Sequence, residues 1–192
     1  GSVGSVTIAS TDGLIFNGSG VLRTMRVRGD AFGGLNFDHI GSLVVDGQLS
    51  GNVAASEVDG EGVSIGSIRA ATTSILRITT ALAPSRGEPG RGDTTFFPRV
   101  GAIKSLRLAE GGGGNDRVMI SAGRIGTFTV TGKSSAALAG DLRVSLLLSE
   151  NGETIGKMNV KGVLTGDVVT LGSVNEIKTA GLVNLQMCVG AA

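Results

Sequence analysis

Few residues of this chain could do chemistry, and the most specific candidate is the stretch GGGGNDRVM at residues 111–119. It fits a nine-residue calcium-binding pattern in which glycine carbonyls and an aspartate carboxylate supply hard oxygen ligands. Gly111 to Asp116 would supply those ligands here. One copy of the pattern gives only half a site, and no second copy follows. A plain glycine-rich turn explains the same residues, so we expect no cofactor and keep calcium at Gly111–Asp116 as the less favoured alternative.

Hydrolytic chemistry would have to use His39, which is the only histidine. Its neighbour Asp38 is adjacent in the chain and is therefore badly placed to orient the same ring, as a Ser-His-Asp triad requires. We expect instead a histidine at a turn just before Ile40. Cys188 lies among apolar residues with no flanking motif, which favours a buried, inert thiol. No residue is assigned a catalytic or metal-binding role.

A stretch rich in proline and glycine, residues 79–99, contains all three prolines of the chain. Proline cannot donate to a β-ladder, so this stretch predicts a loop that projects from the fold. Loops on rigid scaffolds often contact partners. The candidate contacts are Arg91 and Asp93, in an RGD tripeptide familiar from integrin ligands but easily reached by chance, and Phe96 and Phe97. We favour the alternative that both phenylalanines cover the local core.

The overall composition excludes several classes of protein. There are 17 basic and 16 acidic residues, giving a net charge of +1, so nothing indicates binding to nucleic acid or to an anionic membrane. No apolar run approaches the roughly 20 residues of a membrane helix, so we expect no membrane insertion. A single cysteine excludes an internal disulfide framework. The 33 glycines accompany a hydrophobic fraction of 41%, which indicates a folded aliphatic core.

The sequence repeats itself: IGSLVVDGQLSGNV at residues 40–53 returns as IGKMNVKGVLTGDV at residues 155–168. Weaker copies share an apolar residue, usually a glycine, any residue, and a second apolar residue. Equivalent positions that recur along a chain are typical of repeat architectures. The first residues of the eight copies are Val3, Leu22, Ile40, Ile65, Val100, Ile125, Ile155 and Leu171.

Within each copy the local period is two. Leu43 and Val45 point one way while Val44 and Asp46 point the other, which predicts a strand with one buried face. A glycine then follows, and glycine accepts corner geometry that a side chain would penalise. The other predicted buried pairs are Met25/Val27, Phe128/Val130 and Met158/Val160, and the predicted corner glycines are Gly47, Gly132 and Gly162.

Short strands, glycine corners and variable insertions together predict an all-β fold, a parallel β-helix or β-solenoid of about eight irregular coils. Residues 1–192 would form one domain, with the 79–99 loop as its largest projection. An antiparallel β-sandwich is the alternative, although it does not explain why one motif returns in phase. A doubly wound α/β fold is poorly supported, because no segment keeps a helical period.

The phrase shared by the two best copies resembles the degenerate β-helix repeats of large bacterial surface and secreted proteins, adhesin-like or autotransporter-like. The resemblance implies an extracellular or cell-surface location and a scaffolding, adhesive or fibre-forming role. The repeats run from Val3 past Leu171 with no polar cap at either end, so we expect the chain to be a segment of a longer protein. The expected partners are other copies or neighbouring repeats of the same protein, and surface glycans. No functional residue carries over from this resemblance.

The enzymatic alternative is a polysaccharide-binding or polysaccharide-cleaving parallel β-helix. Cleavage needs clustered carboxylates, or aspartate with arginine and lysine, on one exposed sheet. The outward position before the corner glycine instead has mixed charges, and Trp and Tyr, the usual platforms for sugar stacking, are absent. We therefore predict a non-enzymatic protein. The residues at that outward position are Arg28, Asp46, Thr131 and Lys161.

Overall fold

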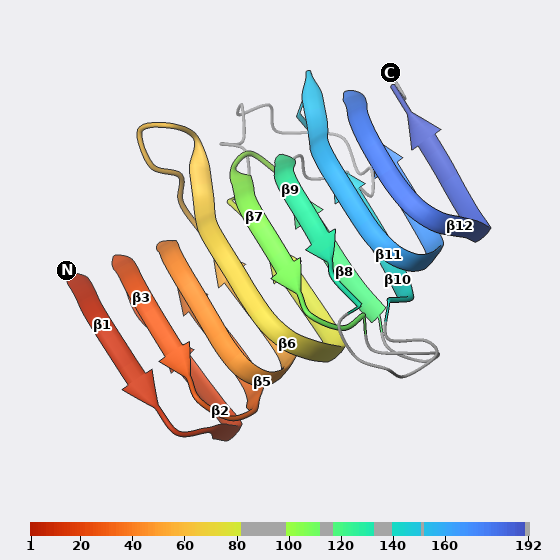
Figure 1. Cartoon of the computed structure of the whole chain (residues 1–192). Helices are drawn as coiled ribbons and strands as arrows, with labels where there is room; N and C mark the ends of the chain where they lie inside the picture. The colour runs from red at the N-terminus through yellow and green to blue at the C-terminus, as the bar shows by residue number, and fades with distance from the viewer. Residues whose placement is uncertain (82–98, 112–116, 133–139, 151, 191–192) are drawn as a thin grey trace, which may run out of the picture.

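The computed structural model describes residues 1–81, 99–111, 117–132, 140–150 and 152–190. These residues form β-strands joined by turns, with no helix among them (Figure 1). The strands are β1 (Ser2–Ile8), β2 (Thr11–Asn17), β3 (Val21–Val27), β4 (Ala31–Phe37), β5 (His39–Ala55), β6 (Val63–Thr79), β7 (Ala102–Leu108), β8 (Arg117–Ala122), β9 (Arg124–Val130), β10 (Leu142–Leu148), β11 (Glu153–Thr170) and β12 (Ser173–Val189).

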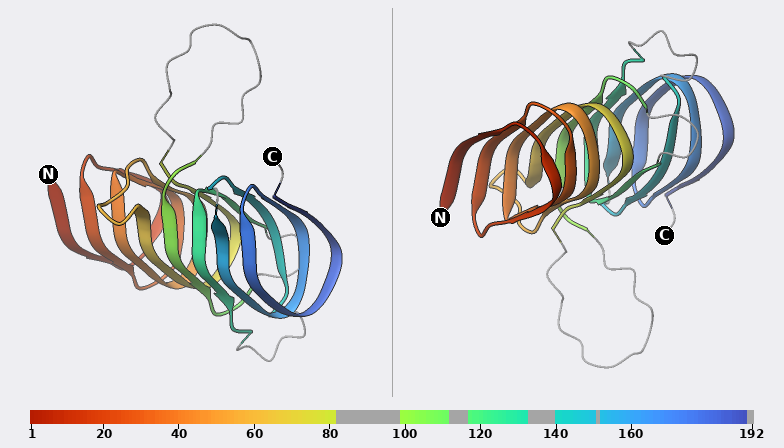
Figure 2. Two further views of the ribbon diagram at one scale, coloured as in Figure 1. Left: turned by 90° about the horizontal axis from the view of Figure 1, so that it is seen from above. Right: turned by 90° about the horizontal axis from the view of Figure 1, so that it is seen from below.

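Every strand pairing is parallel, and the strands stack into two walls. The first wall contains β1, β3, β7, β9 and the first parts of the long strands β5, β6, β11 and β12. The second wall contains β2, β4, β8, β10 and the remaining parts of those long strands. Each wall of the described chain thus has eight stacked segments, which we call rungs, joined by about seven turns of a flattened coil (Figure 2). The predicted β-solenoid is confirmed, and the antiparallel sandwich is wrong.

The register confirms most of the repeat and corrects two copies. Ile40 pairs with Ile65, and Ile125 with Ile155, as the sequence predicts. The next predicted first residue, Val100, is wrong, because Ile65 pairs with Ile103. Leu171 is wrong for the same reason, since Ile155 pairs with Val174. Residues at the same register position on successive strands form a column. In both copies the short glycine motif begins three residues before its expected position, so its last residue, rather than its first, lies in the column of Ile40 and Ile65.

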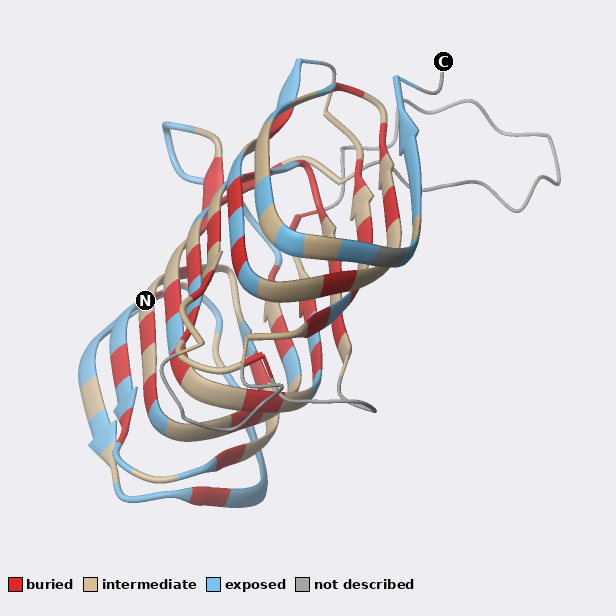
Figure 3. Ribbon diagram, turned by 45° about the vertical axis from the view of Figure 1, so that its right-hand side comes forward, coloured by how far each residue is buried: buried red, intermediate tan, exposed pale blue. Residues whose placement is uncertain are grey.

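The predicted alternation places the core correctly. Leu43, Val45, Met158 and Val160 are all buried, and Phe128 is the largest of the fully buried side chains. Equivalent residues of successive rungs contact one another inside the coil, so each rung covers the apolar face of its neighbour. Figure 3 shows this interior as buried stripes that recur along the stack and fade at both ends. Stacking therefore buries what one coil alone would leave exposed.

The corner glycines are required, but mostly for a different reason from the predicted one. Only Gly132 has a left-handed backbone, with φ of 55°. At Gly47 and Gly162 the backbone of the preceding coil lies too close for a side chain. A Cβ atom would stand 2.8 Å from the carbonyl carbon of Gly29 and 2.4 Å from that of Gly140, respectively. These corners therefore demand glycine because coil packs directly on coil.

Two aspartates fix these corners from the preceding coil. The Oδ1 atom of Asp30 accepts a hydrogen bond from the backbone N–H of Gln48, at 2.8 Å. Asp141 does the same for the N–H of Val163, at 2.7 Å. A carboxylate that accepts a backbone N–H satisfies a donor that the corner would otherwise leave unpaired. The same device recurs more than 100 residues apart in the chain.

Candidate functional site

A groove of about 530 Å³ is formed where the first four rungs of the second wall end. Its floor is a column that runs across the rungs. Asn17 pairs in register with Asn36, Asn36 with Ala54, and Ala54 with Thr79. At a rung spacing of about 4.8 Å this column is about 14 Å long. The groove therefore runs along the axis of the solenoid rather than along a strand.

The two asparagines leave part of their hydrogen-bonding capacity unused. The Nδ2 atom of Asn36 donates to Oδ1 of Asn17 at 2.7 Å, and both side chains are exposed. A primary amide has two N–H donors and an oxygen with two lone pairs. One hydrogen bond between the pair therefore leaves both donors of Asn17 and the acceptor oxygen of Asn36 facing solvent. The ring of Phe37 packs against Gly18 beside them.

Asp38 is held in place at the edge of the groove. Its carboxylate accepts hydrogen bonds from the backbone N–H of Gly20 and from the hydroxyl of Ser56, the latter at 3.1 Å. These partners come from the preceding and the following coil, so Asp38 bridges three coils. A carboxylate fixed by two donors keeps its negative charge at one defined position in the groove.

Arg99 provides the positive charge of the groove and is also fixed. Its backbone N–H donates to Oγ of Ser149 at 2.6 Å, and the Ser149 hydroxyl donates to the Arg99 carbonyl at 2.8 Å. The guanidinium donates to the carbonyl of Thr80 at 2.7 Å. Partial burial lowers the pKa of Arg99 by desolvating the cation. No acidic side chain in the described ranges forms an ion pair with it.

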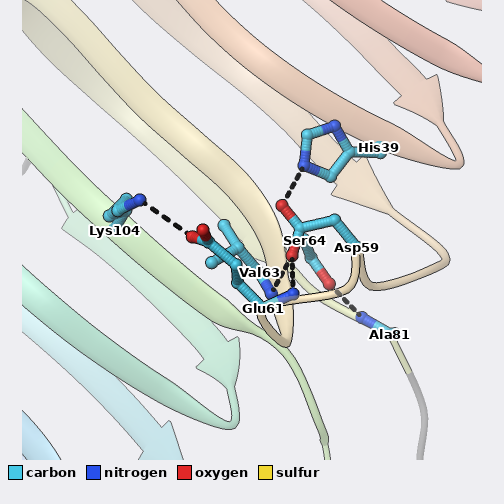
Figure 4. A network of polar contacts seen from close by, with 7 residues as sticks. All are labelled: His39, Asp59, Glu61, Val63, Ser64, Ala81 and Lys104. Atoms are coloured by element: carbon cyan, nitrogen blue, oxygen red, sulfur yellow. Dashed lines mark hydrogen bonds and ion pairs between the residues drawn. The ribbon is translucent and has the colours of Figure 1, made fainter.

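A second polar cluster lies at the exposed turn of residues 56–62 (Figure 4). The Oδ1 atom of Asp59 accepts the backbone N–H groups of Glu61 and Val63, each at 2.9 Å. The pKa of Asp59 is lowered mainly by the hydrogen bond from Val63, against the opposing effect of desolvation, and further by the bond from Glu61 and by His39 and Lys104. Asp59 therefore shapes the turn.

His39 is the first residue of β5, not a turn residue as predicted, and it faces a carboxylate that the sequence did not indicate. Its Nε2 atom lies 3.5 Å from Oδ2 of Asp59 and has no hydrogen-bond partner. Ser64, the nearby hydroxyl drawn in Figure 4, is fully buried and accepts the N–H of Ala81. The three residue types of a hydrolase triad thus lie near one another, but the serine is enclosed and does not contact the histidine.

We expect the Asp59→Asn substitution to destabilise the protein at pH 7 and to matter less in acid. A carboxylate whose pKa is lowered by folding stabilises the fold above its unfolded pKa, about 3.9, and that stabilisation is lost as the pH falls through the folded pKa. The difference in melting temperature between wild type and Asp59→Asn should therefore shrink between pH 6 and pH 3. Asp12→Asn, in the exposed strand β2, is the control. A constant difference over this range would contradict the proposed role.

The outward face of the first wall holds ion pairs between coils, but of the four predicted ladder residues only Asp46 forms one in the described ranges. The carboxylate of Asp46 pairs with Arg26 of the preceding coil at 2.9 Å, two residues before the predicted Arg28. Further along, Glu176 pairs with Lys157 at 3.2 Å and also with Lys178, and these two lysines lower its pKa. Such exposed pairs each contribute little to stability. They give the wall a solvated, mutually neutralising surface.

Several predicted residues stay untested or are corrected. Arg91, Asp93, Phe96 and Phe97 lie outside the described residues, as does the calcium stretch after Gly111. Cys188 is exposed, so the predicted buried thiol is wrong. It pairs in register with Val169, whereas Met187 and Val189 on either side of it continue the core columns. Within the described ranges, no three His, Cys, Asp or Glu side chains lie close enough to hold a metal ion.

The sequence alone does not predict the groove. Its polar residues come from four coils of unequal length. They lie side by side only because the register between the strands aligns the ends of those coils. One signal was available, because Asn17 and Asn36 each directly follow an apolar residue, the half-buried Phe16 and the buried Leu35, at or next to the end of a strand. Nothing comparable marks Arg99, whose place depends on Ser149, 50 residues away in the chain.

The arrangement of parallel rungs around one aliphatic core defines the chain as a β-solenoid. Comparison with family models, with curated proteins and with solved structures finds no match. The described residues include no helix that could cross a membrane.

Proposed function

We propose that this chain is a non-enzymatic structural solenoid, a scaffold or adhesive segment whose two ends pair with further β-rungs. The observation that carries the proposal is the exposure of core columns at both ends of the stack (Figure 3). Val3 and Leu14 of the first coil, and Leu182, Met187 and Val189 of the last coil, are exposed although their register partners inside the stack are mostly buried.

The two ends have complementary patterns. In the first wall the half-buried Val174 and Ile177 of the last rung occupy the same register positions as the exposed Val3 and the half-buried Val6 of the first rung. A rung laid on either end would bury apolar residues against apolar residues and would pair a free strand edge. Unpaired edges readily template further strands. A head-to-tail contact of this kind does not close on itself, so it favours a filament.

An extracellular or cell-surface location follows from the resemblance of the repeat to those of bacterial surface proteins and is part of the proposal. The lone cysteine is compatible with it. The outward pairing of charges supports a structural role better than a catalytic one, because a general acid needs a raised pKa, whereas the two lysines beside Glu176 lower the pKa of that carboxylate.

We expect the isolated protein to associate in a concentration-dependent way, and we expect Met187→Lys to weaken that association at least tenfold. The substitution places a charge in the column that a neighbouring rung would cover, and that charge would have to be desolvated. Sedimentation velocity between 10 and 300 µM measures the effect.

The matched control is Gln186→Lys, which adds the same charge one residue away on the outward side of β12. It should leave association nearly unchanged. A wild-type protein that stays monomeric at every concentration would refute the proposal. So would equal weakening by Met187→Lys and Gln186→Lys, because that result would indicate nonspecific charge repulsion instead of stacking.

A further inference from the structure

The groove across the first four rungs has a separation of charge that the structural role does not use. Asp38 follows the second rung of the second wall, whereas the Arg99 guanidinium is bound to Thr80, which follows the fourth rung. Two rungs correspond to about 10 Å along the axis. The negative end is already satisfied by two donors, while the positive end has no acidic partner in the described part of the chain.

The groups that remain available in the groove are side chains, not backbone. Gly18 N–H donates to the Asn36 carbonyl, Ser56 N–H to that of Phe37, and Asp38 N–H to that of Gly20. These bonds between coils use the main-chain donors that an extended peptide would need for strand addition. The free amide groups of Asn17 and Asn36, in contrast, can both donate to and accept from hydroxyl groups.

We propose that this groove binds a short acidic oligosaccharide lying along the solenoid axis. A carboxylate of one sugar pairs with the Arg99 guanidinium, which has donors left after its bond to Thr80. Hydroxyl groups of the neighbouring neutral sugar bond to Asn17 and Asn36, and its apolar face lies against Phe37. The fixed charge of Asp38 disfavours a second carboxylate at that end, so the ligand alternates acidic and neutral units.

The test uses the full chain and a hyaluronan hexasaccharide, in which uronic acid alternates with N-acetylglucosamine. Isothermal titration calorimetry at 50 mM salt should show saturable binding that weakens as salt is raised. Chitohexaose, a neutral chain of the same length, should bind at least tenfold more weakly. The Arg99→Gln variant should lose at least tenfold in affinity for the hyaluronan fragment, since a partly desolvated charge pair is removed.

Arg69→Gln is the matched control, because it removes the same charge from the exposed outer face of the first wall. It should change affinity less than twofold. Asn17→Ala is the second variant, chosen because this exposed residue can be truncated without opening the core, and it should weaken binding at least threefold. Circular dichroism checks that each variant is folded. If Arg99→Gln does not fold, Asn17→Ala decides.

Three results would overturn the proposal. They are the absence of saturable binding at millimolar hexasaccharide, equal affinity for the neutral and the acidic chain, and equal loss in Arg99→Gln and Arg69→Gln. None of them bears on the pairing of the solenoid ends. Conversely, a protein that stays monomeric in sedimentation would leave this groove and its ligand unaffected.

Discussion

Replacing Gly51 with alanine should strongly destabilise the second wall of the solenoid. Gly51 has φ of 105°, a region that side chains rarely adopt, and a Cβ atom would stand 1.9 Å from the carbonyl oxygen of Gly33 on the preceding rung. Backbone strain alone costs about 1–3 kcal/mol, and here the rungs would also have to separate. We expect a loss of about 3 kcal/mol or more in the free energy of unfolding.

The control for this substitution is Gly34→Ala, in the neighbouring rung of the same wall. Gly34 does not have a left-handed backbone, and the nearest atom to its added Cβ would be a side-chain carbon of Ile15 at an ordinary 3.5 Å. Restricting the unfolded chain should make this change neutral or slightly stabilising. Urea denaturation followed by circular dichroism measures both variants. Similar losses in the two would show that rung-to-rung contact does not set the need for glycine.

Truncating Phe128 to alanine should cost about 3–5 kcal/mol, the range seen when a large aromatic side chain is removed from a core. Phe128 is fully buried and stands between Leu106 and Met158 in one column of the first wall. Neither neighbour can fill the space without leaving its own rung, so a cavity remains. Phe128→Leu keeps most of the volume and should cost much less.

Because Phe128 lies in an internal coil, the shape of the unfolding transition of Phe128→Ala also reports on how tightly neighbouring coils are coupled. Solenoid stability is roughly a sum of coil stabilities and interfaces between coils, so a cavity in an internal coil can uncouple the coils on its two sides. Phe128→Ala should therefore broaden the urea transition or split it in two, whereas Phe128→Leu should keep one transition. A Phe128→Ala loss below 1 kcal/mol would contradict this view of the core.

The alternation of apolar and polar residues with a period of two predicts most of the fold. It placed Leu43, Val45 and Phe128 inside, because a strand with one buried face must alternate. It failed at Val100 and Leu171, where a short glycine motif was given more weight than the apolar column. Lys104 shows why, since it occupies the motif position that Gly66 fills in the rung before it.

Where glycine fills that motif position, it lies close against the preceding coil. A Cβ atom at Gly41 would lie 2.5 Å from the carbonyl oxygen of Arg23, and at Gly126 it would lie 2.7 Å from that of Lys104. Such contacts depend on how one coil sits on another, which no local pattern encodes. The groove was unpredictable for the same reason. Asn36 and Arg99 lie in the same groove only because coils of different lengths are stacked on one another.

The continuity of the apolar columns has a consequence for how such a molecule can vary. The same columns run from coil to coil, and the register shifts where one strand holds an extra residue, as between Leu49 and Gly51. Gaining or losing one whole coil would leave all remaining interfaces unchanged and would shift everything beyond it by one step of about 4.8 Å. The distance along the axis between two surface features is therefore always a whole number of these strand-to-strand steps.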